Sequence, residues 1–164
     1  GTLEPSLSPS MDIMVSSNFE RFLFDLFEGD SSRVESFVSN LNNNAQQVSE
    51  TEWNRAKRVF DSCRVDDDAT CAIIKEVYEE YGYLLDPHSA TGVKAARECC
   101  AGSANPVICL ATAHPAKFAE AIERAGLETP ALPEHLKDLL EREERFKVLP
   151  AELDAVKALI NESL

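Results

Sequence analysis

Glycine is scarce in this sequence, and the few glycines stand apart from one another. The 164 residues contain six glycines, and no two of them are neighbours. A loop that holds a phosphate group needs closely spaced glycines, because its backbone N–H groups must approach the ligand. The chain therefore offers no candidate for a glycine-rich phosphate-binding loop.

Positive charge is also in short supply. Lys and Arg number 16 against 29 Asp and Glu, which gives a net charge of −13. This balance argues against nucleic acid or an anionic membrane surface as the main partner. No apolar run is long enough to span a bilayer, and the first residues lack the pattern of a signal peptide. We expect a cytoplasmic protein that binds neither nucleic acid nor membrane.

The cysteines lack the spacing of a metal site. There are five of them, an odd number: Cys63, Cys71, Cys99, Cys100 and Cys109. Paired Cys and His at short intervals, as in zinc sites, do not occur. We interpret the cysteines as reduced thiols that act as small hydrophobic residues, with Cys109 in a buried strand, and we predict no metal site.

Helical periodicity dominates the chain. Capping boxes begin at Ser17 and Ser49, where a Glu three residues later can reach back to the serine N–H. Asp66 and Asp86-Pro87 are typical of helix starts, and we expect Trp53, Ala56, Phe60 and Cys63 to form one buried stripe. Eight helices are predicted, at approximately 17–29, 30–42, 49–63, 66–82, 86–102, 115–126, 136–140 and 153–160.

One strand is predicted, and two polar residues follow it. The run Val107–Ala111 is apolar throughout and rich in β-branched residues, which favours a strand covered on both faces. Thr112 stands at its carboxyl end, and His114-Pro115 opens a helix. A single strand must pair with another to satisfy its backbone. Its partner is either the short Thr2-Leu3 piece or a strand outside this chain.

Asp12 interrupts an otherwise apolar run. It lies within Met11–Val15, after a proline-rich extended stretch. An aspartate here is typical of a turn or a cap. A place in a ligand pocket is the alternative, and both interpretations stay open.

Three segments of the chain form a recognisable set. The first is Leu7–Ile13, continuing through Ser16–Arg21; the second is Asp86–Ala90, "DPHSA"; the third is Ala111–Phe118, "ATAHPAKF". In their residues, order and separations, the three segments together resemble the threonine synthases. The resemblance covers nearly the whole chain from about Ser6 and weakens in the C-terminal third. It is a resemblance to the C-terminal portion of such an enzyme.

The resemblance implies a specific chemistry. Threonine synthases are pyridoxal 5'-phosphate (PLP) lyases of the tryptophan-synthase-β type. They convert O-phospho-L-homoserine and water into L-threonine and phosphate. The Schiff-base lysine and the phosphate loop are then expected outside this chain, so we predict no catalytic residue within it and an inactive isolated chain. Lys117 is not the expected Schiff-base lysine.

The resemblance also implies roles for individual residues. Thr112 matches the position whose hydroxyl faces the pyridine nitrogen of the cofactor; a helix cap is the structural alternative. His114 either shapes the pocket floor, caps the helix or acts as an acid or base. His88 is interpreted as a packed or surface imidazole. Asp12 and His114 are therefore possible pocket residues, and Thr112 is the one predicted cofactor contact.

The predicted fold is mainly α with one main strand, as the C-terminal part of an α/β enzyme of PLP fold type II. Residues 1–164 form a single region that joins the remainder of the enzyme. Its parts are an extended segment at 1–17, a helical region at 18–104, a strand-turn-helix at 105–126 and C-terminal helices at 127–164. The alternative hypothesis is a non-catalytic, acidic helical interaction module derived from the same family.

Overall fold

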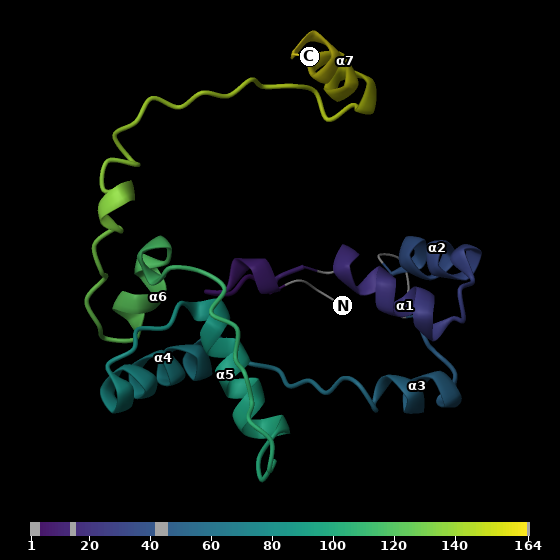
Figure 1. Cartoon of the computed structure of the whole chain (residues 1–164), viewed down its shortest axis with the longest axis horizontal. Helices are drawn as coiled ribbons and strands as arrows, with labels where there is room; N and C mark the ends of the chain where they lie inside the picture. The colour runs from purple at the N-terminus through teal and green to yellow at the C-terminus, as the bar shows by residue number, and fades with distance from the viewer. Residues whose placement is uncertain (1–3, 14–15, 42–45, 164) are drawn as a thin grey trace. The chain divides into compact units, whose positions relative to one another are not determined.

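The computed structural model describes residues 4–13, 16–41 and 46–163, and within them the chain is helical without a β-strand (Figure 1). The α-helices are α1 Glu20–Leu26, α2 Ser31–Asn40, α3 Glu50–Ala56, α4 Asp67–Tyr81, α5 Pro87–Cys99, α6 Ala119–Arg124 and α7 Leu153–Ser163. Short 3-10 helices are η1 Pro9–Met11, η2 Ser17–Phe19, η3 Pro115–Lys117 and η4 Glu134–Leu136. The chain divides into two compact units, residues 1–130 and 131–164.

Side-chain caps start the central helices where the sequence predicts them. Ser49 and Glu52 form the reciprocal capping box of α3. Asp66 accepts a hydrogen bond from the backbone N of Ala69 at 2.9 Å, which begins α4. At the other end of α4, Gly82 adopts a left-handed conformation with φ of 67°. The mainly helical prediction is confirmed.

Four local predictions are wrong, and each has a backbone reason. The Ser17 capping box does not form, because the Glu20 N–H bonds to the Ser17 carbonyl in the 3-10 turn η2. Helix α3 ends at Ala56, so the predicted stripe breaks up and Trp53 and Phe60 are exposed. The helix expected at 115–126 splits into η3 and α6, because Phe118 leaves helical geometry with φ of −130°. The helix expected at 136–140 is reduced to η4 and the turn after it.

The predicted strand at 107–111 does not form in the described part of this chain. Its residues are exposed rather than buried, with Ile108 85% and Leu110 74% accessible, and the Cys109 side chain is exposed as well. The physical reason is the missing neighbour, since a strand exists only through hydrogen bonds to another strand. The short piece Thr2-Leu3, one of the two proposed partners, lies outside the described residues.

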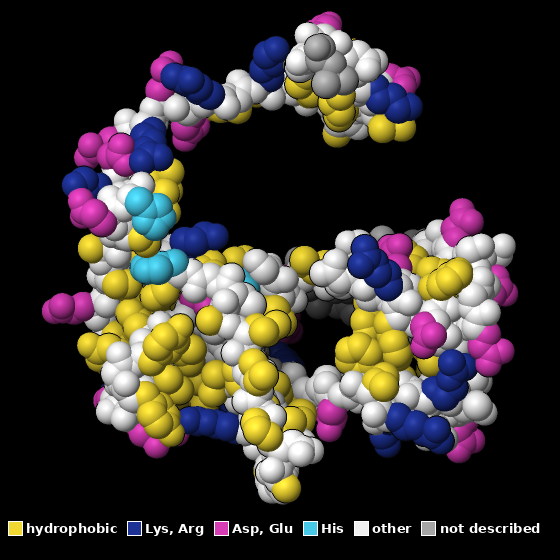
Figure 2. All heavy atoms as spheres, viewed as in Figure 1, with side chains coloured by type: hydrophobic (Ala, Val, Ile, Leu, Met, Phe, Trp, Pro, Cys, Tyr) yellow, Lys and Arg dark blue, Asp and Glu magenta, His cyan; other side chains and the backbone are white. Residues whose placement is uncertain are grey.

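The larger core packs helices α4, α5 and α6 together. Ile74 of α4, Ala90 of α5 and Ile122 of α6 are fully buried in it. Leu7, from the extended N-terminal segment, and Phe118, from the residue after η3, pack against this cluster. Figure 2 shows hydrophobic side chains gathered over this part of the molecule. The core therefore brings segments that are far apart in the sequence to the start of α5.

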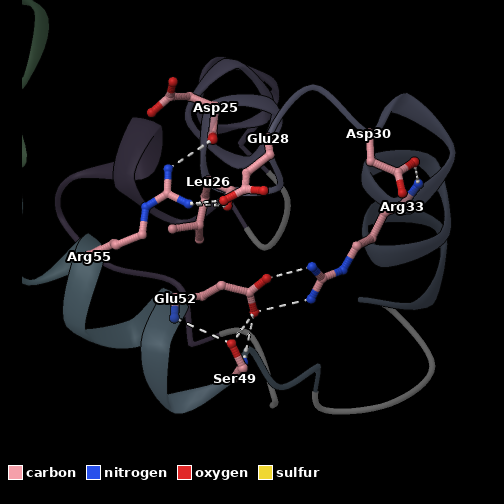
Figure 3. A network of polar contacts seen from close by, with 8 residues as sticks. All are labelled: Asp25, Leu26, Glu28, Asp30, Arg33, Ser49, Glu52 and Arg55. Carbon is pink, nitrogen blue, oxygen red and sulfur yellow. Dashed lines mark hydrogen bonds and ion pairs between the residues drawn. The ribbon is translucent and has the colours of Figure 1, made fainter.

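A second, smaller core joins α1 and α2, with Val48 from the segment before α3 packed against it. Leu23, Leu26 and Phe27 are its buried residues. Arg33 on α2 makes a two-pronged ion pair with Glu52 on α3, and Arg55 bonds to backbone carbonyls of α1 (Figure 3). Polar contacts therefore reinforce a small apolar contact.

The unit 131–164 contains η4 and α7. Helix α7 buries none of its residues, although it has an apolar face. None of the helices in the described ranges combines the length and the apolar character that crossing a membrane requires.

Candidate functional site

The site begins at the first turn of α5, where Asp86 is the N-cap. Its backbone is extended, with φ of −78° and ψ of 160°, and Pro87 follows at a position that needs no N–H. The Asp86 Oδ1 atom accepts hydrogen bonds from the backbone N of His88 at 2.9 Å and of Ser89 at 3.4 Å. Only 1% of Asp86 is exposed. A buried carboxylate is stable here because the N–H groups and the dipole of the helix face it.

His88 connects this carboxylate to the N-terminal segment. The Ser10 backbone N–H donates to His88 Nε2 at 3.1 Å. An N–H can only donate, so Nε2 carries no hydrogen and Nδ1 carries it. Nδ1–H then donates to Asp86 Oδ1 at 3.1 Å. The imidazole is therefore neutral and has one defined tautomer, and its ring packs on Phe118 with 4.7 Å between centroids.

Ser89 connects the same carboxylate to the segment after α5. Its hydroxyl donates to Asp86 Oδ2 and accepts from the backbone N of Thr112, with 3.0 Å between Thr112 N and Ser89 Oγ. The segment turns back after α5 and runs beside it (Figure 1), and Cys109 Sγ lies 3.9 Å from the Gly92 carbonyl oxygen. The network of Ser10, Asp86, His88, Ser89 and Thr112, of which Asp86, His88 and Ser89 are buried, thus joins three separate parts of the sequence. We call it the Asp86 network.

Thr112 and His114 lie at the edge of the Asp86 network. Thr112 is exposed, while its backbone N is held by Ser89. His114 is exposed too, and its Nδ1 accepts from the backbone N of Ala116 at 3.2 Å. His114, rather than Thr112, is therefore the N-cap of η3. The cap interpretation holds for His114 and fails for Thr112, whose cofactor role stays a prediction.

Asp12 lines a pocket that lies apart from Thr112 and His114. Its carboxylate accepts from the Ser6 backbone N at 2.7 Å and from the Ser6 hydroxyl at 2.8 Å, which closes a turn. It lines an open pocket of about 640 Å³ with residues from the start of α4, and neither Thr112 nor His114 is among the residues that line this pocket. Arg124, which also lines it, is paired with Asp67 and Asp68. The turn interpretation of Asp12 fits this geometry, and its pocket role stays a prediction.

Comparison with known proteins gives one consistent result. Residues 89–160 match the family model described as threonine synthase, C-terminal. The threonine synthase of Pseudomonas aeruginosa is 52% identical over 163 residues, which cover 98% of this chain and 35% of that protein. The chain is therefore similar to threonine synthases, and the family model places the likeness in their C-terminal portion. The yeast threonine synthase of Saccharomyces cerevisiae is 37% identical over 97% of the chain and 36% of its own length.

Solved threonine synthase structures share the fold. A PLP-bound threonine synthase from Brucella melitensis superimposes with a TM-score of 0.81 at 42% identity, covering 99% of this chain and 35% of that protein. The yeast enzyme structure gives 0.75 at 35% identity, covering 98% of this chain and 36% of its own. The chain thus spans about a third of the length of the threonine synthases that it matches.

Two members of the Asp86 network, Ser10 and Ser89, have local sequence patterns that indicate no role for them. The other two predictions agree with the structure: Asp86 is a helix cap, and His88 is a packed residue rather than a surface residue. The available signal was the threonine synthase resemblance itself, because Ser10 and Ser89 lie in two of the segments that carry it.

Proposed function

We propose that this chain is the C-terminal portion of a PLP-dependent threonine synthase. The complete enzyme converts O-phospho-L-homoserine and water into L-threonine and phosphate. The observation that carries this proposal is the 52% identity to a threonine synthase across 98% of the chain. The Asp86 network supports it, since it joins the three segments that resemble the family.

Thr112 is the residue of this chain that we propose to contact the cofactor. Its backbone is anchored and the residue is exposed, so its hydroxyl can meet a group held by the remainder of the enzyme. A neutral hydroxyl suits the pyridine nitrogen of PLP, because it can donate one hydrogen bond without supplying a charge. When bound, PLP supplies the electron sink for the reaction. His114, which caps η3, is the proposed floor of the same pocket.

The segment 107–111 is proposed to pair with a strand in the remainder of the enzyme. Ile108 is 85% exposed and Leu110 74%, and in a strand these two side chains, two residues apart, would lie on one face of the sheet and be buried there. Pairing would also satisfy the backbone groups that have no ladder in the described part of this chain. The strand and the site would then be positioned together, because Thr112 follows directly.

We propose the cytoplasm as the location of the enzyme. All five cysteines are free thiols, which fits a reducing compartment. The proposed partners are the substrate and the remainder of the enzyme. The strong negative charge, −13, gives no support to nucleic acid as a partner.

The test is the activity of the full-length protein that carries this chain. With PLP and O-phospho-L-homoserine, we expect the amount of phosphate released to match the amount of threonine formed. A phosphate assay measures the first product, and mass spectrometry measures the second. A protein that folds and binds PLP but makes no threonine would contradict the proposal and favour the non-catalytic module.

A second experiment uses the chain alone. Borohydride reduction in the presence of PLP, followed by mass spectrometry, is expected to label no lysine stoichiometrically. Stoichiometric labelling of a single residue, for example Lys117, would show that this chain carries the Schiff-base lysine and would overturn the assignment of roles.

A further inference from the structure

We propose that Ser89 and Asp86 are positioning residues, which set the place of Thr112 through its backbone; this inference rests on the proposed function. The chain of contacts is short. Thr112 N donates to Ser89 Oγ at 3.0 Å, and the Ser89 hydroxyl donates to Asp86 Oδ2. Twenty-three residues of sequence separate Thr112 from Ser89, so the bond fixes a tertiary position.

The direction of each hydrogen bond in the Asp86 network is determined. The Asp86 carboxylate can only accept, so the Ser89 hydroxyl hydrogen points to it and the oxygen lone pair faces the Thr112 N–H. Nδ1–H of His88 donates to the other oxygen of the same carboxylate, Oδ1. All these bonds point to one buried acceptor, and such chains strengthen one another in a low dielectric.

Ser89 and Asp86 differ in burial from Thr112, the residue that they hold. Asp86 is 1% exposed and Ser89 2%, whereas Thr112 and the residues before it, 101–111, are exposed. The stretch 107–111 lacks a strand partner within the described residues, so tertiary hydrogen bonds to α5 hold it. The Ser89 bond is much the shorter of the two. Loss of the Ser89 hydroxyl would therefore act on Thr112 first.

The same carboxylate also couples Thr112 to the N-terminal segment. Ser10 N–H donates to His88 Nε2, and His88 donates to Asp86. The network therefore holds two backbone amides, those of Ser10 and Thr112, at the start of α5. Removing the Ser89 hydroxyl should release the Thr112 amide and leave the Ser10 amide protected. This difference separates positioning from a general loss of structure.

The experiment measures amide hydrogen exchange and kinetics in the full-length protein with Ser89→Ala. We expect the Thr112 amide to exchange about tenfold faster, which is the effect of one lost net hydrogen bond. The Ser10 amide should be unchanged. With O-phospho-L-homoserine, kcat should fall about tenfold while KM stays within twofold. Ser89→Thr keeps the hydroxyl and should restore both properties.

Thr70→Val is the matched control. Thr70 is also buried, 1% exposed, and its hydroxyl bonds the Asp66 carbonyl at 2.9 Å in the first turn of α4. Its loss should leave the Thr112 amide and kcat unchanged. Ser89→Cys is a second variant that keeps the bulk of the side chain but accepts hydrogen bonds weakly, and it should behave like Ser89→Ala.

Two outcomes would overturn the inference. One is equal Thr112 exchange in Ser89→Ala and the unsubstituted protein. The other is faster exchange with unchanged kcat, which would leave Ser89 a purely structural residue. Failure of the proposed function looks different, since the unsubstituted protein would then form no threonine. In that case the exchange measurement would still decide whether Ser89 holds Thr112.

Discussion

Replacing Glu52 by glutamine tests whether an ion pair holds α3 to α2. The Glu52 carboxylate accepts from the guanidinium of Arg33, with 3.0 Å between Nη2 and Oε2, and from the Ser49 backbone N at 2.8 Å (Figure 3). These bonds, with that of Arg33 the largest cause, lower the pKa of Glu52 from 4.5 to about 2. The carboxylate form is thus strongly favoured in the folded protein.

The magnitude follows from this shift. The fall in the pKa of Glu52 sets an upper limit of about 3 kcal/mol, at about 1.4 kcal/mol per tenfold change in proton affinity. The Arg33 side chain is 45% exposed, so solvent screens the pair and we expect about 1–2 kcal/mol. For a chain of this size, that corresponds to a melting temperature lower by about 2–8 °C in Glu52→Gln.

The pH dependence has a definite sign. The pKa of Glu52 is lower in the folded state, so its stabilisation is fully present above about pH 4.5 and is lost as the pH falls toward 2. Trp53, the single tryptophan, lies in α3 next to Glu52 and reports its unfolding by fluorescence. The stability difference between the unsubstituted protein and Glu52→Gln should therefore shrink between pH 7 and pH 2.5.

Glu28→Gln is the matched control for this pair. Glu28 pairs with Arg55 at 3.1 Å, but its side chain is 83% exposed, so its loss should hardly change the melting temperature. A Glu52→Gln melting temperature equal to that of the unsubstituted protein at pH 7 would refute the prediction. A stability difference that stays constant down to pH 2.5 would refute it as well.

Three further predictions concern other parts of the chain. Gly82→Ala should lower stability by about 1 kcal/mol, because φ is 67° there, whereas Gly92→Ala within α5 should raise it slightly; urea unfolding decides both. In the isolated chain, iodoacetamide should modify exposed Cys109 well before buried Cys71, where burial raises the thiol pKa, and equal rates by mass spectrometry would contradict the packing. We expect the exposed, unpaired stretch 107–111 to make the isolated chain self-associate and Ile108→Lys to reduce this association, measured by light scattering; unchanged association would place the contact elsewhere.

The sequence predicts the helix starts well where a side chain alone determines them. Ser49, Asp66 and Asp86 each cap a helix as expected, because the cap and its backbone donor lie within three residues. It fails where competing backbone bonds decide, as at Ser17, whose carbonyl accepts the Glu20 N–H. It also fails at 107–111, since pairing depends on residues that are distant or absent from this chain.

The Asp86 network shows a similar limit for the site. The family resemblance directs attention to Thr112 and His114, and local patterns identify Asp86 as a cap. No local pattern indicates that the Ser89 hydroxyl meets the Thr112 amide, or that Ser10 meets His88. Those contacts arise only when the core of α4, α5 and α6 has formed. Tertiary packing thus forms the contacts of Ser10 and Ser89, which no local sequence pattern indicates.

The most direct test of the account is the absorbance spectrum of bound PLP in the full-length protein with substitutions at Thr112. We expect Thr112→Ser to keep the spectrum and the turnover, because the hydroxyl remains. Thr112→Ala should shift the absorbance and lower turnover about tenfold, and more if the ring nitrogen is left buried and unpaired. Thr112→Asp should shift the spectrum further by favouring a protonated ring nitrogen. A Thr112→Ala protein with the unsubstituted spectrum and turnover would contradict the claim that this chain supplies a cofactor contact.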